Sequence, residues 1–138
     1  MSNFTISGVF KGAAIGGAIG GVGNVLLYLA GGAAGAAYLM APPGGGEPAP
    51  IPLAMPFIMT LVPGLLGAAI LAGLLKFVPA RAWTIFLVIS ALVFLAMLPG
   101  PVMQMGDDTV AVVVLEIMHL VAAAGVIGGI HTLGRGAQ

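Results

Sequence analysis

Residues 12–31 read GAAIGGAIGGVGNVLLYLAG, an apolar run without a charged side chain. About 20 helical residues cross the hydrocarbon core of a bilayer, so this stretch is long enough for one span. Three further apolar segments of similar length follow at residues 52–75, 80–98 and 108–131. The sequence therefore predicts an all-α integral membrane protein in which residues 1–138 form one domain, a bundle of four transmembrane helices.

The composition of the chain points to the same class. Of its 138 residues 60% are hydrophobic and 6% are charged, whereas a soluble domain carries about 25% charged residues. Four basic and four acidic side chains give a net charge of zero. This balance excludes the basic surface of a nucleic-acid-binding protein. The chain has no cysteine, so disulfides, thiolate metal sites and cysteine nucleophiles are excluded.

The connections between the spans differ in kind. Residues 42–50, PPGGGEPAP, form an outer loop that is expected to be neither helix nor strand, because proline and glycine disfavour both. Residues 76–81 form a tight inner turn. Residues 99–107 form a second outer loop that ends the third helix and supplies Asp107 or Asp108 as the cap of the fourth.

The charges give the orientation of the spans. With four spans, all four basic residues fall on one side of the bilayer: Lys11, Lys76, Arg81 and Arg135. The three acidic residues of the outer loops fall on the other side: Glu47, Asp107 and Asp108. Cytoplasmic loops carry an excess of lysine and arginine. We therefore expect both termini to be cytoplasmic.

Glycine recurs every four residues along the first span, a spacing that keeps one helix face free of side chains. The rows are Gly8, Gly12, Gly16 and Gly20, with Gly17 and Gly21 beside them, and Gly125 and Gly129 in the fourth span. Such a face lets another backbone approach closely, and this contact drives helix association in lipid. The partner is either another helix of the same bundle or a second copy joined through a glycine zipper.

The second span contains Pro63 close to its middle. Proline inside a helix removes a backbone hydrogen bond and bends the helix. We expect a kink at Pro63, which is either a purely structural bend or part of a gate.

Glu116 and His119 are the ionisable residues that lie deep in a span, and their spacing of three places both on one face of the fourth helix. A carboxylate at the centre of a transmembrane helix costs about 2.5 to 3.5 kcal/mol, so it should face the bundle interior, pair or become neutral. By depth alone, Asn24, Tyr28 and Thr60 can reach the same level. We therefore expect a buried polar or proton site made of these five residues.

Three interpretations of this polar site remain. The pair could be structural, hydrogen-bonded to neighbours and holding helices together. It could be a proton or ligand site, because histidine exchanges protons near neutral pH. Alternatively, His119 could ligate a haem or a pigment; a di-iron site would need a second Glu-x-x-His motif and two further glutamates. We expect no metal site and no resident cofactor.

No other part of the sequence resembles a catalytic set. The serines have no histidine–acid partners, and a phosphate-binding Gly-Lys-Ser/Thr loop is missing. An enzyme is therefore not expected, and no catalytic residue is assigned.

The stretch Met118 to Ala124, MHLVAAA, resembles the last helix of a bacterial four-helix membrane family known as domain of unknown function 6069. Asn24 within the first span and Leu98-Pro99 at the end of the third also resemble this family, over residues 12–133 in all. The resemblance implies the four-span topology and a bacterial plasma (inner) membrane location, and it transfers no activity. The glycine rows and Glu116 are not features of the resemblance.

The leading functional interpretation is a small membrane protein without covalent catalysis. It would be a homo-oligomer or an accessory subunit of other membrane chains, assembled in the lipid bilayer through its glycine faces, with a buried polar site at Glu116 and His119. The alternatives are a proton-coupled channel or small-solute carrier that uses the same two residues, and a haem- or pigment-binding subunit.

Overall fold

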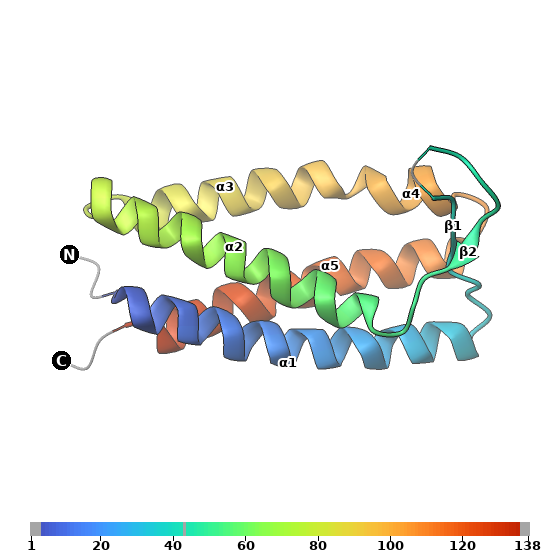
Figure 1. Cartoon of the computed structure of the whole chain (residues 1–138), viewed down its shortest axis with the longest axis horizontal. Helices are drawn as coiled ribbons and strands as arrows, with labels where there is room; N and C mark the ends of the chain where they lie inside the picture. The colour runs from blue at the N-terminus through green and yellow to red at the C-terminus, as the bar shows by residue number, and fades with distance from the viewer. Residues whose placement is uncertain (1–3, 43, 136–138) are drawn as a thin grey trace.

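The computed structural model describes residues 4–42 and 44–135 and contains five helices and one short strand pair (Figure 1). In chain order the elements are α1 (Ile6–Ala33), β1 (Leu39–Met40), β2 (Ala49–Pro50), α2 (Met55–Phe77), α3 (Ala82–Met97), α4 (Pro99–Met105) and α5 (Thr109–Leu133). The fold is all-α apart from the two-residue antiparallel pairing of β1 with β2. The start of α1 and the end of α5 lie at the same end as the α2–α3 turn, and we call this the terminus end; the strands and α4 lie at the opposite, loop end.

Four helical segments are long and apolar enough to cross a membrane: Ile6–Ala33, Met55–Phe77, Ala82–Met105 and Thr109–Leu133. They correspond to the four predicted spans, and they indicate a membrane protein. The first begins six residues before the predicted start because Thr5 caps it, with its Oγ1 accepting from the Gly8 N–H at 3.1 Å. Asp108 caps α5 in the same way through the Ala111 N–H at 2.9 Å, which confirms one of the two predicted caps.

Two predictions about the outer loops were wrong. Residues 99–107 are not an irregular loop, because Pro99–Met105 form α4, which continues the direction of α3 after a break at Leu98. Proline is tolerated in the first helical turn, where its missing N–H has no partner to lose. In the other loop, Ala49–Pro50 pair with Leu39–Met40, an edge position that proline also permits. Residue 43 of that loop lies outside the described residues.

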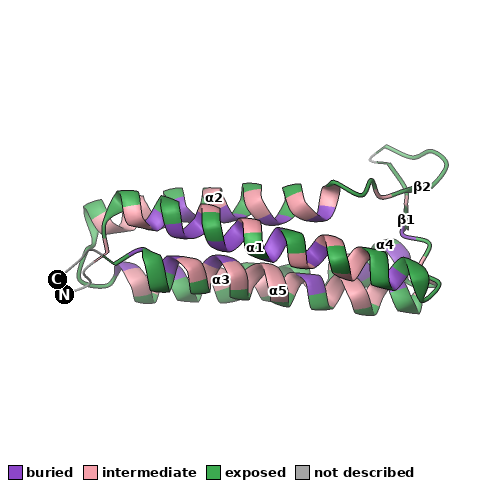
Figure 2. Ribbon diagram, turned by 90° about the horizontal axis from the view of Figure 1, so that it is seen from below, coloured by how far each residue is buried: buried purple, intermediate pink, exposed green. Residues whose placement is uncertain are grey.

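The helices pack unequally. α1 lies in close contact with α5 and with α2 along most of its length, whereas α3 contacts α2 and α5 more sparsely. Only Ala82 and Phe86 of α3 are buried, and the rest of that helix is intermediate or exposed (Figure 2). The bundle is therefore a tight three-helix core with α3 laid against one side.

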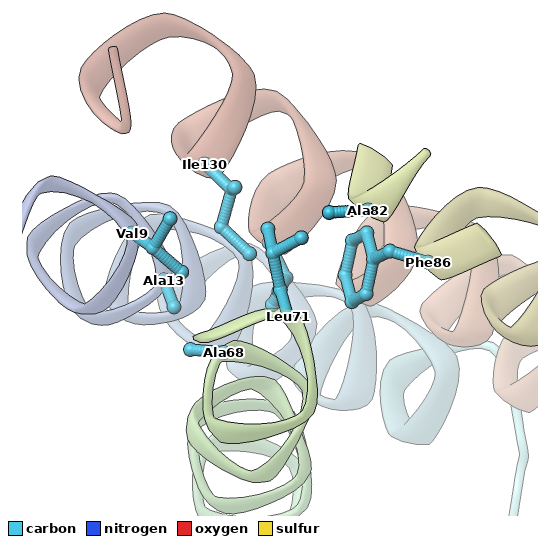
Figure 3. Close-up of a cluster of buried hydrophobic side chains, with 8 residues drawn as sticks. Val9, Ala13, Ala68, Leu71, Ala82, Phe86 and Ile130 are labelled. Carbon is cyan, nitrogen blue, oxygen red and sulfur yellow. The ribbon is translucent and has the colours of Figure 1, made fainter. Parts of the chain in front are cut away.

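Two apolar clusters hold the bundle at its ends. The cluster near the terminus end takes residues from all four long helices (Figure 3): Val9, Ala13, Ala68, Leu71, Ala82, Phe86, Val126 and Ile130. The cluster at the loop end is formed around Tyr38, Met105 and Ala111. Of the candidate-site residues, Asn24 and Thr60 lie along the bundle between these clusters, whereas Tyr28 packs against the cluster at the loop end.

Candidate functional site

The glycine rows of α1 pack inside the chain. A Cβ atom on Gly12 would lie 2.5 Å from the carbonyl oxygen of Gly129 and 2.8 Å from two further backbone atoms of α5. Gly8 meets Gly134 in the same way, and Gly16 meets Gly125. The backbones of α1 and α5 therefore touch directly, and we call this contact the glycine seam.

The second glycine row faces a different helix. Gly17 lies against Leu61 of α2, and Gly21 lies against the ring of Phe57. Gly20 stands between the two partners, near Val121 of α5 and Thr60 of α2. The two rows predicted from the four-residue spacing thus pack on two helices of the same chain.

Asn24 joins three helices at one point deep in the bundle. Its Nδ2 donates to Thr60 Oγ1 on α2 at 2.9 Å and to the Met118 carbonyl on α5 at 3.0 Å. Thr60 Oγ1 donates in turn to the Pro56 carbonyl at 2.8 Å. Asn24 and Thr60 are each only 3% exposed. This contact brings together two of the five predicted site residues.

Glu116 and His119 do not join this contact. His119 Nδ1 donates to the Leu115 carbonyl, one turn back on its own helix, at 2.7 Å. Glu116 Oε2 is buried and has no hydrogen-bond partner in the described part of the chain. Glu116 is two residues from Met118, about 200° around the helix. Because Met118 faces α1, the Glu116 carboxyl lies on the side of α5 that faces away from α1.

Tyr28 belongs to a separate network at the loop end. Its Oη donates to the Ile51 carbonyl at 2.5 Å, and its ring stacks on that of Tyr38 with centroids 4.3 Å apart. Tyr38 Oη donates to the Tyr28 carbonyl at 3.1 Å. This network was not predicted from the sequence. One available signal was Gly31, whose missing side chain leaves the space that the Tyr38 hydroxyl fills.

Asp108 ties the chain after α1 to the start of α5. Its carboxylate accepts from the Ala37 N–H at 2.8 Å as well as from Ala111. The hydrogen bonds from Ala111 and then Ala37 hold the pKa of Asp108 below its usual value. The pKa of Tyr38 is raised, first by burial and then by the neighbouring Tyr28 and Asp108. The loop end is therefore organised by a charged cap and two stacked rings.

The family of the chain follows from a match over nearly its whole length. A family model described as "Family of unknown function (DUF6069)" matches residues 5–135. The chain belongs to this family. The resemblance drawn from the Met118–Ala124 stretch is confirmed. No curated protein and no solved structure matches the chain.

Two further features of this DUF6069 member bear on the predicted site. Pro63 lies inside α2, which continues as a helix through it, and the kink and any gating role stay predictions. Among residues 4–42 and 44–135, no group of three or more histidine, cysteine, aspartate or glutamate side chains is placed to hold a metal ion. With Nδ1 of His119 bound to Leu115, Nε2 is the ring nitrogen that could contact another group.

Proposed function

We propose that this DUF6069 member is a multi-pass protein of a bacterial plasma membrane with both termini in the cytoplasm. Lys11, Lys76, Arg81 and Arg135 belong to the terminus end, whereas Glu47, Asp107 and Asp108 belong to the loop end. The positive-inside rule then places the terminus end in the cytoplasm. The family resemblance supports a bacterial membrane.

We further propose that the protein is a non-enzymatic membrane subunit that assembles as a homo-oligomer. The observation that carries this proposal is the buried Glu116 Oε2, which has no hydrogen-bond partner among the described residues. An unpaired polar group in an apolar surrounding costs about 1–3 kcal/mol. Glu116 as a whole is only half-buried, so rotation of its carboxyl can bring the unpaired oxygen to the surface, and a neighbouring chain that offers a hydrogen bond there removes that cost.

The position of Glu116 supports a contact between copies that does not use the glycine seam. The seam is filled by α1 and α5 of one chain, while Glu116 lies on the side of α5 that faces away from α1. His119 lies on the same face as Glu116, and its Nε2 is not used by the Leu115 bond. In a two-fold symmetric interface, a contact between one residue of the first copy and another residue of the second copy occurs twice, once in each direction. Glu116 of each copy can thus pair with His119 of the other through one proton, carried either by the Glu116 carboxyl or by Nε2 of a protonated His119, because an unprotonated Nε2 only accepts.

The test is the native mass of the purified protein in detergent and in nanodiscs. We expect a fixed oligomer for the wild type, a shift towards monomer for Glu116→Leu, and retention of the oligomer by Glu116→Gln, which keeps a polar group. Glu47→Leu, which removes a carboxylate from the exposed loop, is the matched control and should leave the mass unchanged. A monomeric wild type, or an oligomeric Glu116→Leu, would overturn the proposal.

The same samples test the alternative functions. A proton-coupled channel or carrier would show proton flux in proteoliposomes that Glu116→Leu and His119→Ala abolish while the mass stays constant. A visible absorption band lost in His119→Ala would identify a haem or pigment carrier, whereas our proposal requires no cofactor. Co-purification with one other membrane chain at fixed stoichiometry, with no homo-oligomer, would make the protein an accessory subunit.

A further inference from the structure

An apolar groove runs along the outside of the glycine seam. Its volume is about 260 Å³, and its floor is the seam itself. Ile15 and Ile19 of α1 form one wall, and the other wall belongs to α5 and consists of the small residues Ala124, Gly128 and Thr132 with Leu133 at its end. All of these wall residues are exposed, so the groove opens outwards along the spans.

The walls of the groove offer hydrocarbon and no free hydroxyl donor. The Thr132 hydroxyl donates back to its own helix, to the Gly128 carbonyl at 2.8 Å and towards that of Gly129 at 3.3 Å. At Gly128 no atom lies within 4 Å of where a Cβ would stand, so the groove is open there. An occupant of this section is therefore apolar and slender.

The groove ends among positive charges. Lys11 precedes Ile15 by one helical turn on the same side of α1, and Arg135 follows Thr132 by three residues at the end of α5. Both side chains are exposed. The Arg135 guanidinium lies 5.7 Å from the centroid of the Phe4 ring and donates to His131 Nε2 at 2.7 Å, which uses one of its five donors.

Within residues 4–42 and 44–135, no carboxylate side chain lies beside these cations. Three of the four acidic residues of the chain, Glu47, Asp107 and Asp108, are at the loop end, and the fourth, Glu116, faces away from α1. The terminus end of the groove is therefore complementary to an anion. Basic pockets between transmembrane helices are a recurring way to hold anionic lipid head groups.

We propose that this groove binds an anionic phospholipid. One acyl chain lies between the isoleucine wall of α1 and the small-residue wall of α5, and the phosphate lies at Lys11 and Arg135. A second copy is disfavoured as the occupant, because copies inserted with the same orientation would bring the Lys11 and Arg135 charges of both chains together. Like charges across such an interface oppose association.

Lipid retention measured by native mass spectrometry tests the proposal. The protein is released from nanodiscs made of phosphatidylglycerol and phosphatidylcholine with identical acyl chains. Each basic residue near a membrane surface contributes about 1 kcal/mol of attraction to anionic lipid, so we expect a roughly 10- to 30-fold preference for phosphatidylglycerol. The double variant Lys11→Gln/Arg135→Gln should retain both lipids equally.

A second pair of variants tests the acyl-chain site. Gly128→Leu fills the groove where space is open and should lower retention of both lipids. Gly73→Leu makes the same change on α2, also where no atom lies within 4 Å, and should leave retention unchanged. Equal retention of the two lipids by the wild type, or full retention by Gly128→Leu, would overturn the proposal. A loss of oligomer mass in Gly128→Leu would assign the groove to a second copy instead.

Discussion

Replacing Gly12 by alanine should loosen the bundle, because the added methyl has no space in the glycine seam. The new Cβ would stand 2.5 Å from the Gly129 oxygen, where ordinary contact begins at 3.4 Å. The obstructing atoms all belong to the backbone of α5, including Ile130 Cα at 2.8 Å. They cannot rotate away as a side chain would, so α1 and α5 must separate.

The cost of that separation can be worked from dispersion energies. A gap of 0.5–1 Å forfeits about a quarter to a half of the attraction of each atom pair, which is about 0.1–0.2 kcal/mol per pair. If the seam holds roughly 40 such pairs, as a buried leucine does, the loss is about 1–4 kcal/mol. Alanine regains up to about 1 kcal/mol through its better helix propensity. With the full gain subtracted, we expect Gly12→Ala to destabilise the fold by up to about 3 kcal/mol.

The matched control lies on the same helix. A Cβ on Gly23 would meet only the end of the Val121 side chain, at 3.4 Å, so Gly23→Ala should be neutral or stabilising by up to about 1 kcal/mol. Reversible unfolding in mixed micelles, followed by circular dichroism, gives both free energies. Equal stability changes in the two variants would refute the idea that direct backbone contact holds α1 to α5.

Two further predictions concern polar contacts. Asn24→Ala and Thr60→Val should each destabilise the bundle. The double-mutant cycle should give a coupling free energy of about 0.6 kcal/mol, and at most about 1.7 kcal/mol, which is the range for interhelical hydrogen bonds in membranes. A coupling of zero would contradict the hydrogen bond between the two side chains. At the loop end, Asp108→Asn should lower stability at neutral pH, where the carboxylate accepts from Ala37. Because the pKa of Asp108 is lowered in the fold, its contribution is complete above the unfolded value of about 3.9 and is lost as the pH falls through the lowered pKa. Unfolding of the wild type should therefore show an acid-dependent loss that Asp108→Asn lacks, and Asp107→Asn should behave like the wild type.

The spans could be predicted from the sequence because length and hydropathy suffice to define a membrane-crossing helix. The glycine faces were predictable for a similar reason, since a four-residue spacing fixes a helix face. The helix that each face meets depends on how the spans are arranged in space, so periodicity left the partner open. The structure assigns Gly12 to α5 and Gly17 to α2.

The polar site was predicted from depth, and depth alone does not fix direction. Asn24 and Thr60 are at matching depth and also face one another. Glu116 is nine residues before Gly125, about half a turn away around the helix axis. Had Gly125 been taken as the marker of the α1-facing side, Glu116 would have been placed facing away from α1. Helix α4 was not predicted, because Pro99 and Pro101 are compatible both with a loop and with the first turn of a helix.

The glycine seam between α1 and α5 also sets the order in which contacts form while the protein is synthesised and inserted into the membrane. Asn24 donates to the carbonyl of Met118, which lies 94 positions later in the chain. The first span is therefore synthesised well before α5, the helix with which it makes its most extensive contact. Until then its glycine face is open to lipid and to any other small-faced helix nearby. Synthesis of the final helix is thus the step that closes the bundle, and a nascent chain that stops before it leaves the α5-facing glycines of α1 uncovered.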